Sequence, residues 1–259
     1  MKTISIIGAG HIGGAVARGL AAGLEGGAAD IILTATREET LAPFRAEGFR
    51  TMTDNRAAAA RADLLLLAVK PHIIPLVVRE VASVLREDAV VGCLAPGVRP
   101  EDLQAFFGDK QPALLYVIPN TAAEIRQSVT FLSPVNVTED QLAGVEALFA
   151  CVGEVLVVPP HLLSAGTSVA SCGIAYAMRY IRAAVEGAVE LGLYPADALK
   201  AVCGTVQGAA GLLLARGTHP EAEIDKVTTP GGLTIRGLNA MEEAGFTNAV
   251  IRGLKAGAK

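Results

Sequence analysis

The sequence predicts an α/β protein in which a doubly wound parallel sheet is followed by an all-α domain. Strand-like and helix-like segments alternate over the first half of the chain, and a glycine-rich turn, Gly8–Gly13, follows the first strand. After Pro159-Pro160 only helical patterns remain. We therefore expect an α/β domain over residues 1–158 and a helical domain over residues 159–259.

Each element of the first domain follows from its apolar pattern. Short apolar runs between turn residues predict strands, and apolar residues recurring every three or four positions predict helices. The expected strands are Thr3–Ile7, Ile31–Ala35, Arg50–Thr53, Leu64–Val69, Ala89–Leu94 and Leu114–Ile118, with Ser128–Leu132 and Val155–Val158 completing the sheet. The expected helices are Gly13–Ala22, Glu38–Glu47, Arg56–Ala62, Ile74–Leu85, Pro100–Phe107 and Glu139–Ala150. Strict alternation implies parallel strands.

The second half of the chain consists of long and unusually apolar helical segments. They are Leu162–Ser171, Ala175–Leu191, Pro195–Arg216 and Thr234–Ala244. A helix that is apolar nearly all round must be buried. About a hundred residues of helix cannot hide that much surface alone, so we expect a homo-oligomer interface here. Packing against the α/β domain is the alternative.

Composition excludes several classes of protein. A net charge of −4 argues against a nucleic-acid partner, which would need an excess of basic residues. The uncharged stretch Leu162–Met178 is interrupted by Ser, Thr and Gly, so we interpret it as buried and not as a membrane span. Four scattered cysteines have neither zinc-ligand nor disulfide-framework spacing. With no apolar leader at the N-terminus, a cytoplasmic location is expected.

The turn Gly8-Ala9-Gly10-His11-Ile12-Gly13 predicts a dinucleotide site, because it follows a strand and opens a helix. Gly8 permits the tight turn, Gly10 lets the backbone approach a pyrophosphate, and Gly13 lets the helix pack on the strand. The N-terminus of the helix then faces the phosphates.

The end of the second strand indicates which dinucleotide is bound. An NAD site usually has Asp or Glu here to hold the ribose hydroxyls. This chain has Thr36 and Arg37, and a guanidinium matches the geometry of a ribose 2′-phosphate. We therefore expect NADPH as the cofactor. Glu38 and Glu39 follow directly, which leaves NADH possible.

Three further segments follow strands, at the edge where ligands bind in such sheets. Asn55 is expected to cap a helix and also to face the cofactor. Ala68-Val69-Lys70-Pro71 can line the cofactor with its backbone, although Lys70 and the neighbouring His72 could equally be solvated or structural. Asn120 either orients the nicotinamide or the substrate or simply forms a turn.

A second anion-binding turn lies near the C-terminus, within Val227–Ile235. Pro230 fixes the direction of the chain, Gly231 and Gly232 follow, and Thr234 lies where a helix begins. Such a turn directs free backbone N–H groups toward one point, which suits a carboxylate. The hydroxyls of Thr229 and Thr234 flank that point, so we expect the substrate to bind here.

Together these segments resemble the pyrroline-5-carboxylate reductase family over nearly the whole chain. The resemblance rests on Gly8–Gly13, Ala68–Pro75, Pro119-Asn120-Thr121, Ala175-Tyr176, Leu191-Gly192-Leu193 and Val227–Ile235. It implies a Rossmann domain and a helical domain that forms a homodimer, often assembled into a decamer. It also implies NAD(P)H-dependent reduction of the cyclic imine 1-pyrroline-5-carboxylate to L-proline.

The resemblance further implies roles for the residues of the second turn. The substrate carboxylate would bind the backbone N–H groups of Gly231 and Gly232, with a hydrogen bond from Thr229. Thr234 would lie near the imine nitrogen, donating a hydrogen bond or relaying a proton from water. Because an ordinary hydroxyl is a weak acid, positioning should dominate the catalysis.

Several positions depart from the family pattern and leave the substrate open. They are Tyr116, Ile118, Ala122, Arg126–Ser128, Ser171–Ile174 and Arg182. A reductase of another cyclic imino acid and a non-catalytic NADP-binding sensor are therefore alternatives. A hydroxyacid dehydrogenase is a third, but it would normally need a Lys in the long helix Ala175–Leu191, which contains none.

Overall fold

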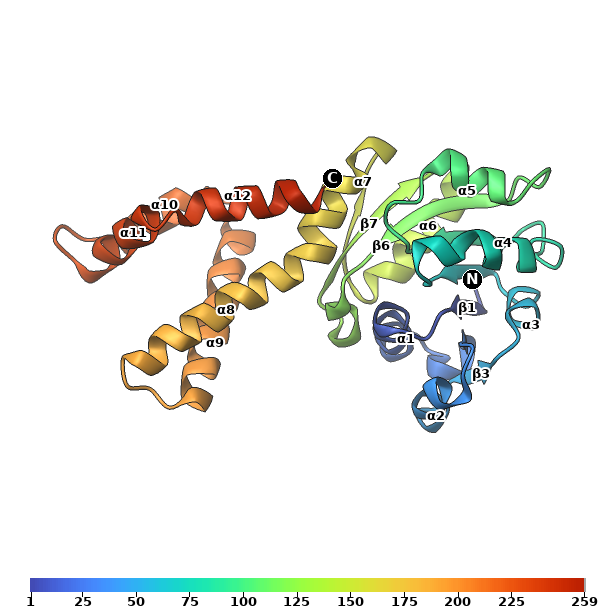
Figure 1. The fold of residues 1–259 in the computed structure, drawn as a ribbon, viewed down its shortest axis with the longest axis horizontal. Helices are drawn as coiled ribbons and strands as arrows, with labels where there is room; N and C mark the ends of the chain where they lie inside the picture. Colours follow the sequence, from blue (N-terminus) through green and yellow to red (C-terminus); the bar gives the residue numbers. More distant parts are fainter. Residues whose placement is uncertain (259) are drawn as a thin grey trace. The chain divides into compact units, whose positions relative to one another are not determined.

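A computed structural model describes residues 1–258, which divide into two compact units (Figure 1). The first unit comprises Met1–Ile174 together with the residues from Gly257 onward, and the second comprises Ala175–Ala256. The first is an α/β unit and the second is helical. The fold class expected from the sequence is confirmed.

The first unit is built on an eight-stranded sheet with the order β3-β2-β1-β4-β5-β6-β7-β8. The strands are β1 (Ile4–Ile7), β2 (Ile31–Thr34), β3 (Arg50–Met52), β4 (Leu64–Leu67), β5 (Val90–Cys93), β6 (Ala113–Ile118), β7 (Ser128–Pro134) and β8 (Gly153–Val157). Every residue of β1, β2, β4 and β5 is buried. Helices cover both faces of these strands, which is why their sequences are almost continuously apolar.

One strand pair departs from the parallel sheet that the alternation implied. The strands from β3 across to β6 in the sheet order are all parallel. In contrast, β7 runs antiparallel to β6, with Ile118 opposite Phe131. The two strands are joined through the short 3-10 helix η3 (Thr121–Ile125). A parallel pair needs a crossover of a dozen or more residues, so this connection only permits the chain to turn back.

Helices pack on both faces of the sheet and form two apolar cores (Figure 1). On one face lie α1 (His11–Gly23), α2 (Glu38–Ala46) and α6 (Glu139–Ala150), with the short helix η1 (Gly27–Asp30) between α1 and β2. On the other lie α3 (Asn55–Ala59), α4 (Ile74–Val81) and α5 (Pro100–Phe106), with η2 (Pro71–Ile73) before α4. The predicted elements recur with ends shifted by a few residues.

The segment after the double proline belongs to the α/β unit. It forms η4 (Pro160–Leu162), α7 (Leu163–Gly166) and a π-helical turn, η5 (Thr167–Cys172), where a single α-helix was expected. Gly166 lies directly on the Phe131 ring of β7, since a Cβ there would come within 2.8 Å of Phe131 Cγ. This packing ties α7 to β7 within the first compact unit, which extends to Ile174.

The second unit consists of long helices with few buried side chains. They are α8 (Gly173–Glu190), α9 (Pro195–Arg216), α10 (Pro220–Lys226), α11 (Leu233–Glu243) and α12 (Phe246–Gly257). Tyr180 packs edge-on against Phe246 with ring centroids 6.2 Å apart, and the Tyr176 hydroxyl donates to Gly253 O, so α12 lies against α8. The sequence did not predict α10, which is short and polar, or α12.

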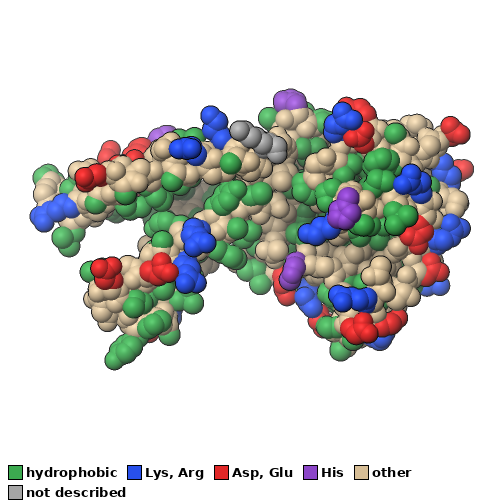
Figure 2. Space-filling view, viewed as in Figure 1, with side chains coloured by type: hydrophobic (Ala, Val, Ile, Leu, Met, Phe, Trp, Pro, Cys, Tyr) green, Lys and Arg blue, Asp and Glu red, His purple; other side chains and the backbone are tan. Residues whose placement is uncertain are grey.

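Many large apolar side chains are exposed on this helical unit, among polar and charged ones (Figure 2). Among the described residues, α9 buries only Ala198, and Leu191, Leu214 and Leu233 are each at least 85% exposed. By length and composition α9 could also cross a membrane. An exposed apolar surface of this extent indicates a partner.

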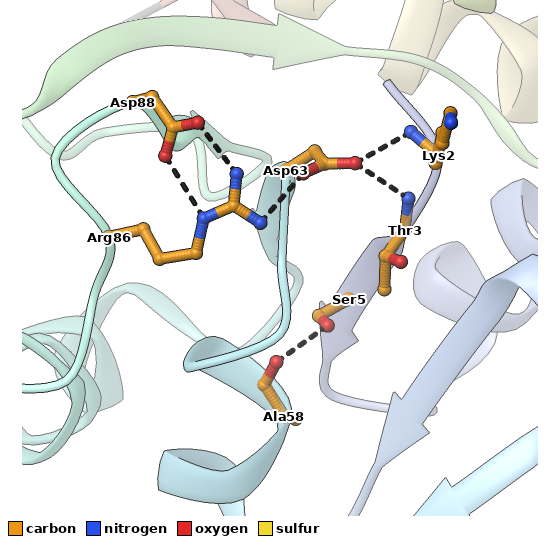
Figure 3. A network of polar contacts seen from close by, with 7 residues as sticks. All are labelled: Lys2, Thr3, Ser5, Ala58, Asp63, Arg86 and Asp88. Carbon is orange, nitrogen blue, oxygen red and sulfur yellow. Dashed lines mark hydrogen bonds and ion pairs between the residues drawn. The ribbon is translucent and has the colours of Figure 1, made fainter.

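A polar network fixes the N-terminal end of the sheet (Figure 3). Asp63 Oδ2 accepts the backbone N–H groups of Lys2 and Thr3 at 2.6 and 2.9 Å, and its Oδ1 lies 2.9 Å from Arg86. Burial works to raise the pKa of Asp63, but these hydrogen bonds outweigh it, so the pKa is lowered. The network therefore joins the start of β1 to the start of β4.

Replacement of Asp63 tests this network. With its pKa lowered in the folded state, the Asp63 carboxylate stabilises the fold above the ordinary aspartate pKa of about 4 and loses that effect as the pH falls. Asp63→Asn should lower the free energy of unfolding at pH 7 by about 1–2 kcal/mol. Urea titrations should show this difference shrinking below about pH 4. The exposed Asp109→Asn is the control, and a pH-independent difference for Asp63→Asn would contradict the assignment.

Candidate active site

The glycine-rich turn forms a closely packed junction between β1, β4 and α1. Gly8 has φ +110°, and a Cβ there would come within 2.7 Å of Ala68 O. A Cβ on Gly13 would collide with the carbonyl oxygen of Gly8. Both positions therefore require glycine for the backbone to pack, Gly8 in its turn and Gly13 where α1 lies against the turn.

Gly10 differs from its neighbours because it faces open space. A Cβ on Gly10 would meet no atom within 4 Å, and this exposed residue caps α1 without any side-chain hydrogen bond. The N–H groups of the first turn of α1, beginning with His11 and Ile12, have no carbonyl four residues earlier in the helix. No acidic residue lies in that turn. This open, uncapped helix start fits the phosphates of a dinucleotide.

The residues after β2 favour NADPH over NADH. Arg37 is exposed, and within residues 1–258 its guanidinium makes no ion pair or side-chain hydrogen bond. Thr36 beside it is also exposed. Glu38 instead binds Arg45, with Oε2 2.7 Å from Nη2. Among the described residues Arg37 thus offers an unpaired cation that suits a 2′-phosphate, while the neighbouring Glu39 is also exposed and unpaired.

Asn55 lies at the same edge but does not cap its helix. Asp54 does so, accepting the N–H of Ala57 at 3.0 Å, and Asn55 is the first residue of α3. The expected capping role of Asn55 is therefore wrong. Its side chain instead accepts a hydrogen bond from the Thr34 hydroxyl at 2.7 Å and donates to Glu80 at 3.0 Å. Neither partner was predicted from the sequence. Only Thr34 carried a signal, its position at the end of a strand.

The segment after β4 lies beside the glycine-rich turn. Ala68 and Val69 are half-buried, and both stand within 3.0 Å of the place a Cβ on Gly8 would occupy. Lys70 and Pro71 are exposed, and Lys70 precedes η2. The structure thus brings the cofactor residues predicted in β1, β2, β4 and their turns to one edge of the sheet.

Asn120 follows β6 at this edge and is 7% exposed. Its Oδ1 accepts the N–H of Ala122 at 2.9 Å, and its Nδ2 donates to Ala170 O at 3.3 Å. Its own N–H donates to Ser128 Oγ at 3.1 Å. Asn120 therefore anchors the start of η3 and the π-helical turn, and its contact with the substrate stays a prediction.

Tyr116, one of the departures from the family pattern, lies on β6 with its hydroxyl donating to Val98 O at 2.7 Å. It is 1% exposed, and burial raises its pKa, so the phenol stays neutral. Beside it lies a cavity of about 200 Å³, also lined by Gly97, Ile118 and Thr167. The side chain secures the loop after β5.

The second turn, Thr229–Thr234, lies in the helical unit and begins α11. Gly231 has φ +71°, and the Gly232 N–H donates to Thr229 O at 2.9 Å. That N–H is occupied, so the groups left for a ligand are those of Gly231 and of the first helical turn, including Thr234. A Cβ on Gly232 would come within 2.5 Å of Thr229 Oγ1.

Both hydroxyls of the second turn are available. Within the described part of the chain, neither Thr229 nor Thr234 has a side-chain hydrogen-bond partner, and both are exposed. Arg236 donates to Gly231 O at 2.8 Å and so holds the turn from its other side. The turn therefore combines free N–H groups with two hydroxyls, as a carboxylate site requires. Residues 1–258 contain no cluster of metal ligands.

Comparison with known proteins identifies the family. Residues 160–259 match the family described as pyrroline-5-carboxylate reductase dimerisation, and residues 3–96 match NADP oxidoreductase, coenzyme F420-dependent. Pyrroline-5-carboxylate reductase of Escherichia coli is 32% identical over 98% of this chain and 94% of its own length. The chain belongs to the pyrroline-5-carboxylate reductase family.

One further relative agrees with this membership, and one solved structure shares the fold. Pyrroline-5-carboxylate reductase 1 of Dictyostelium discoideum is 34% identical over 97% of this chain, which spans only 48% of that longer protein. The Plasmodium falciparum pyrroline carboxylate reductase, solved with NADP bound, has the same fold, with a TM-score of 0.89 and 21% identity over 99% of this chain and 95% of that one.

Family membership confirms several expectations. The chain is an NAD(P)H-dependent oxidoreductase of the pyrroline-5-carboxylate reductase family, and the match of residues 3–96 to an NADP oxidoreductase model agrees with the expected NADPH. The match to the dimerisation family confirms a homo-oligomer. The matched residues include α9, whose apolar side chains are largely exposed.

Two glycine variants separate packing from ligand binding. Gly13→Ala should lower the melting temperature, because its Cβ collides with Gly8 O and displaces α1. Gly10→Ala should keep the wild-type melting temperature but weaken NADPH binding at least about tenfold, because the methyl group enters the open space at the helix start. Thermal unfolding and calorimetric titration check the pair. Wild-type affinity in Gly10→Ala would place the phosphates elsewhere.

Arg37→Ala tests the recognition of the 2′-phosphate. Loss of a charged hydrogen-bond donor should raise KM for NADPH at least about tenfold and leave KM for NADH nearly unchanged. Arg61→Ala removes the same charge from another exposed side chain, which has no ion pair among residues 1–258, and is the control. Equal changes for both cofactors in Arg37→Ala would reject the role.

Proposed function

We propose that this protein reduces 1-pyrroline-5-carboxylate to L-proline with NADPH, in the biosynthesis of proline. The observation that carries this proposal is the turn Thr229–Thr234, whose free N–H groups and two free hydroxyls suit a carboxylated imine. Its sequence was the most specific part of the family resemblance. The relatives from Escherichia coli and Dictyostelium discoideum, which match 98% and 97% of this chain, are both named pyrroline-5-carboxylate reductase.

The residues that would hold NADPH lie at one edge of the sheet. Gly8, Gly10, His11, Ile12 and Gly13 would receive the pyrophosphate at the start of α1. Thr36 and Arg37 would bind the 2′-phosphate, and Asn55 and Ala68–Pro71 would line the cofactor. When bound, NADPH supplies the hydride that the carbon of the C=N bond accepts.

The second turn would bind and orient the substrate. The N–H groups of Gly231 and of the first turn of α11, aided by the Thr229 hydroxyl, would hold the carboxylate. The Thr234 hydroxyl would donate a hydrogen bond to the imine nitrogen, which makes the C=N carbon more electrophilic. Asn120, which is buried at the end of β6, would bind the substrate or the nicotinamide.

Three of the departures from the family pattern, Arg126, Ser128 and Tyr116, make hydrogen bonds to the backbone. Arg126, in the left-handed region with φ 60°, donates to Cys151 O at 2.9 Å, and Ser128 accepts the N–H of Asn120. Tyr116 supports the loop after β5. A reductase of another cyclic imino acid is the runner-up, because these positions depart from the family pattern.

We further propose a homodimer formed through the helices of residues 159–259, with assembly into a decamer, in the cytoplasm. The support for the dimer is the exposed apolar surface of α8 and α9 together with the dimerisation-family match. Residues 1–158 would bind NADPH, and residues 159–259 would supply the substrate turn.

The proposed reaction is tested by comparing substrates. NADPH oxidation should be fast with 1-pyrroline-5-carboxylate and at least about tenfold slower, as kcat/KM, with 1-pyrroline, which lacks the carboxylate that the turn would hydrogen-bond. Faster turnover of the six-membered cyclic imino acid would favour the runner-up instead. No oxidation with any imine would contradict both.

Thr234→Val tests the hydroxyl at the start of α11. The variant keeps the shape of the side chain but removes its hydrogen-bond donor, so kcat should fall at least about tenfold with little change in KM for NADPH. Steady-state kinetics check this, with the exposed Thr247→Val in α12 as control. Wild-type kcat in Thr234→Val would remove this residue from the site.

A further inference from the structure

A chain of hydrogen bonds connects three elements behind the predicted cofactor edge. Glu80, near the end of α4, accepts a hydrogen bond from Asn55 Nδ2 at 3.0 Å. Asn55 Oδ1 accepts one from the buried Thr34 hydroxyl at 2.7 Å. We propose that Glu80 is a positioning residue, which fixes the amide orientation of Asn55 and thereby strengthens NADPH binding.

The donor and acceptor types determine which way the Asn55 amide points between Glu80 and Thr34. An ionised carboxylate only accepts hydrogen bonds, so Glu80 requires the Nδ2 side of the Asn55 amide to face it. The opposite amide orientation would place Oδ1 against the carboxylate, oxygen to oxygen. The Thr34 hydroxyl can donate or accept and would tolerate either orientation. Glu80 therefore decides which way the amide points.

Thr34 connects these hydrogen bonds to the glycine-rich turn. Its carbonyl oxygen accepts the N–H groups of Gly8 at 3.1 Å and Ala9 at 2.9 Å, while its hydroxyl donates to Asn55. Asn55 is thus tied to the backbone that would hold the pyrophosphate. The fixed amide retains one N–H and one lone pair of Oδ1 for a ligand.

The side-chain carboxylate of Glu80 has Asn55 as its hydrogen-bond partner. Arg56, next along α3, donates to the main-chain oxygen of Glu80 at 2.8 Å and to Ser83 Oγ at 3.1 Å. Among the described residues the Glu80 carboxylate has no ion pair, and it is half-buried. Arg56 therefore holds α3 and α4 together, which leaves the carboxylate to orient the amide.

A double-mutant cycle tests the proposal, which rests on Asn55 binding NADPH. Glu80→Gln keeps the size of the side chain but presents both a donor and an acceptor, so the Asn55 amide can reverse. Its Kd for NADPH should rise roughly five- to tenfold, the scale of one misplaced hydrogen bond. In an Asn55→Ala background the same substitution should have no further effect. The change in NADPH fluorescence on binding gives each Kd.

Controls distinguish orientation from charge and folding. Glu87→Gln, on an exposed residue, removes the same charge and should leave Kd unchanged. The kcat of Glu80→Gln should stay near wild type, because the residue acts on binding alone. An unchanged Kd in Glu80→Gln, or an equal effect with and without Asn55, would overturn the proposal. Both outcomes are read from binding, so they do not depend on whether the imine is reduced.

Discussion

The first unit depends on how closely α1 approaches the ends of β1 and β4. At Gly8 and Gly13 there is no room for a Cβ, and the Thr34 carbonyl receives two N–H groups from the same turn. This contact fixes where α1 begins. It therefore also fixes the open space at Gly10, where a phosphate can reach the uncapped helix start. The remaining cofactor residues follow from the parallel register of β1, β2 and β4, which end together.

The second unit, in contrast to the first, has few side chains packed in its interior. Its helices leave large apolar side chains exposed, and burial of that surface between copies would supply the missing hydrophobic stabilisation. Within this unit the turn Thr229–Thr234 is set by local geometry alone: a left-handed Gly231, a bond from Gly232 to Thr229 and a helix start. A local sequence pattern is therefore enough to recognise it.

The sequence predicted well what depends on local pattern. The apolar runs located the strands, and the glycines located the cofactor turn, because Gly8 and Gly13 leave no room for a side chain and Gly10 leaves space for a ligand. Contacts between distant segments were not predictable in this way. The Asn55–Glu80 bond joins residues 25 apart, and the antiparallel β7 followed from a short connection that alternation alone does not reveal. The capping role expected for Asn55 failed because Asp54 competes for the same helix start.

The central claim is that a cofactor hydride reaches the carbon of a cyclic imine that carries a carboxylate. Its most direct test supplies 1-pyrroline-5-carboxylate and NADPH deuterated at the transferable position of nicotinamide C4. The proline formed is then analysed by mass spectrometry. The account predicts one deuterium at C5 of proline, the carbon of the former C=N bond. Proline without deuterium, or deuterated cofactor left unconsumed, would contradict it.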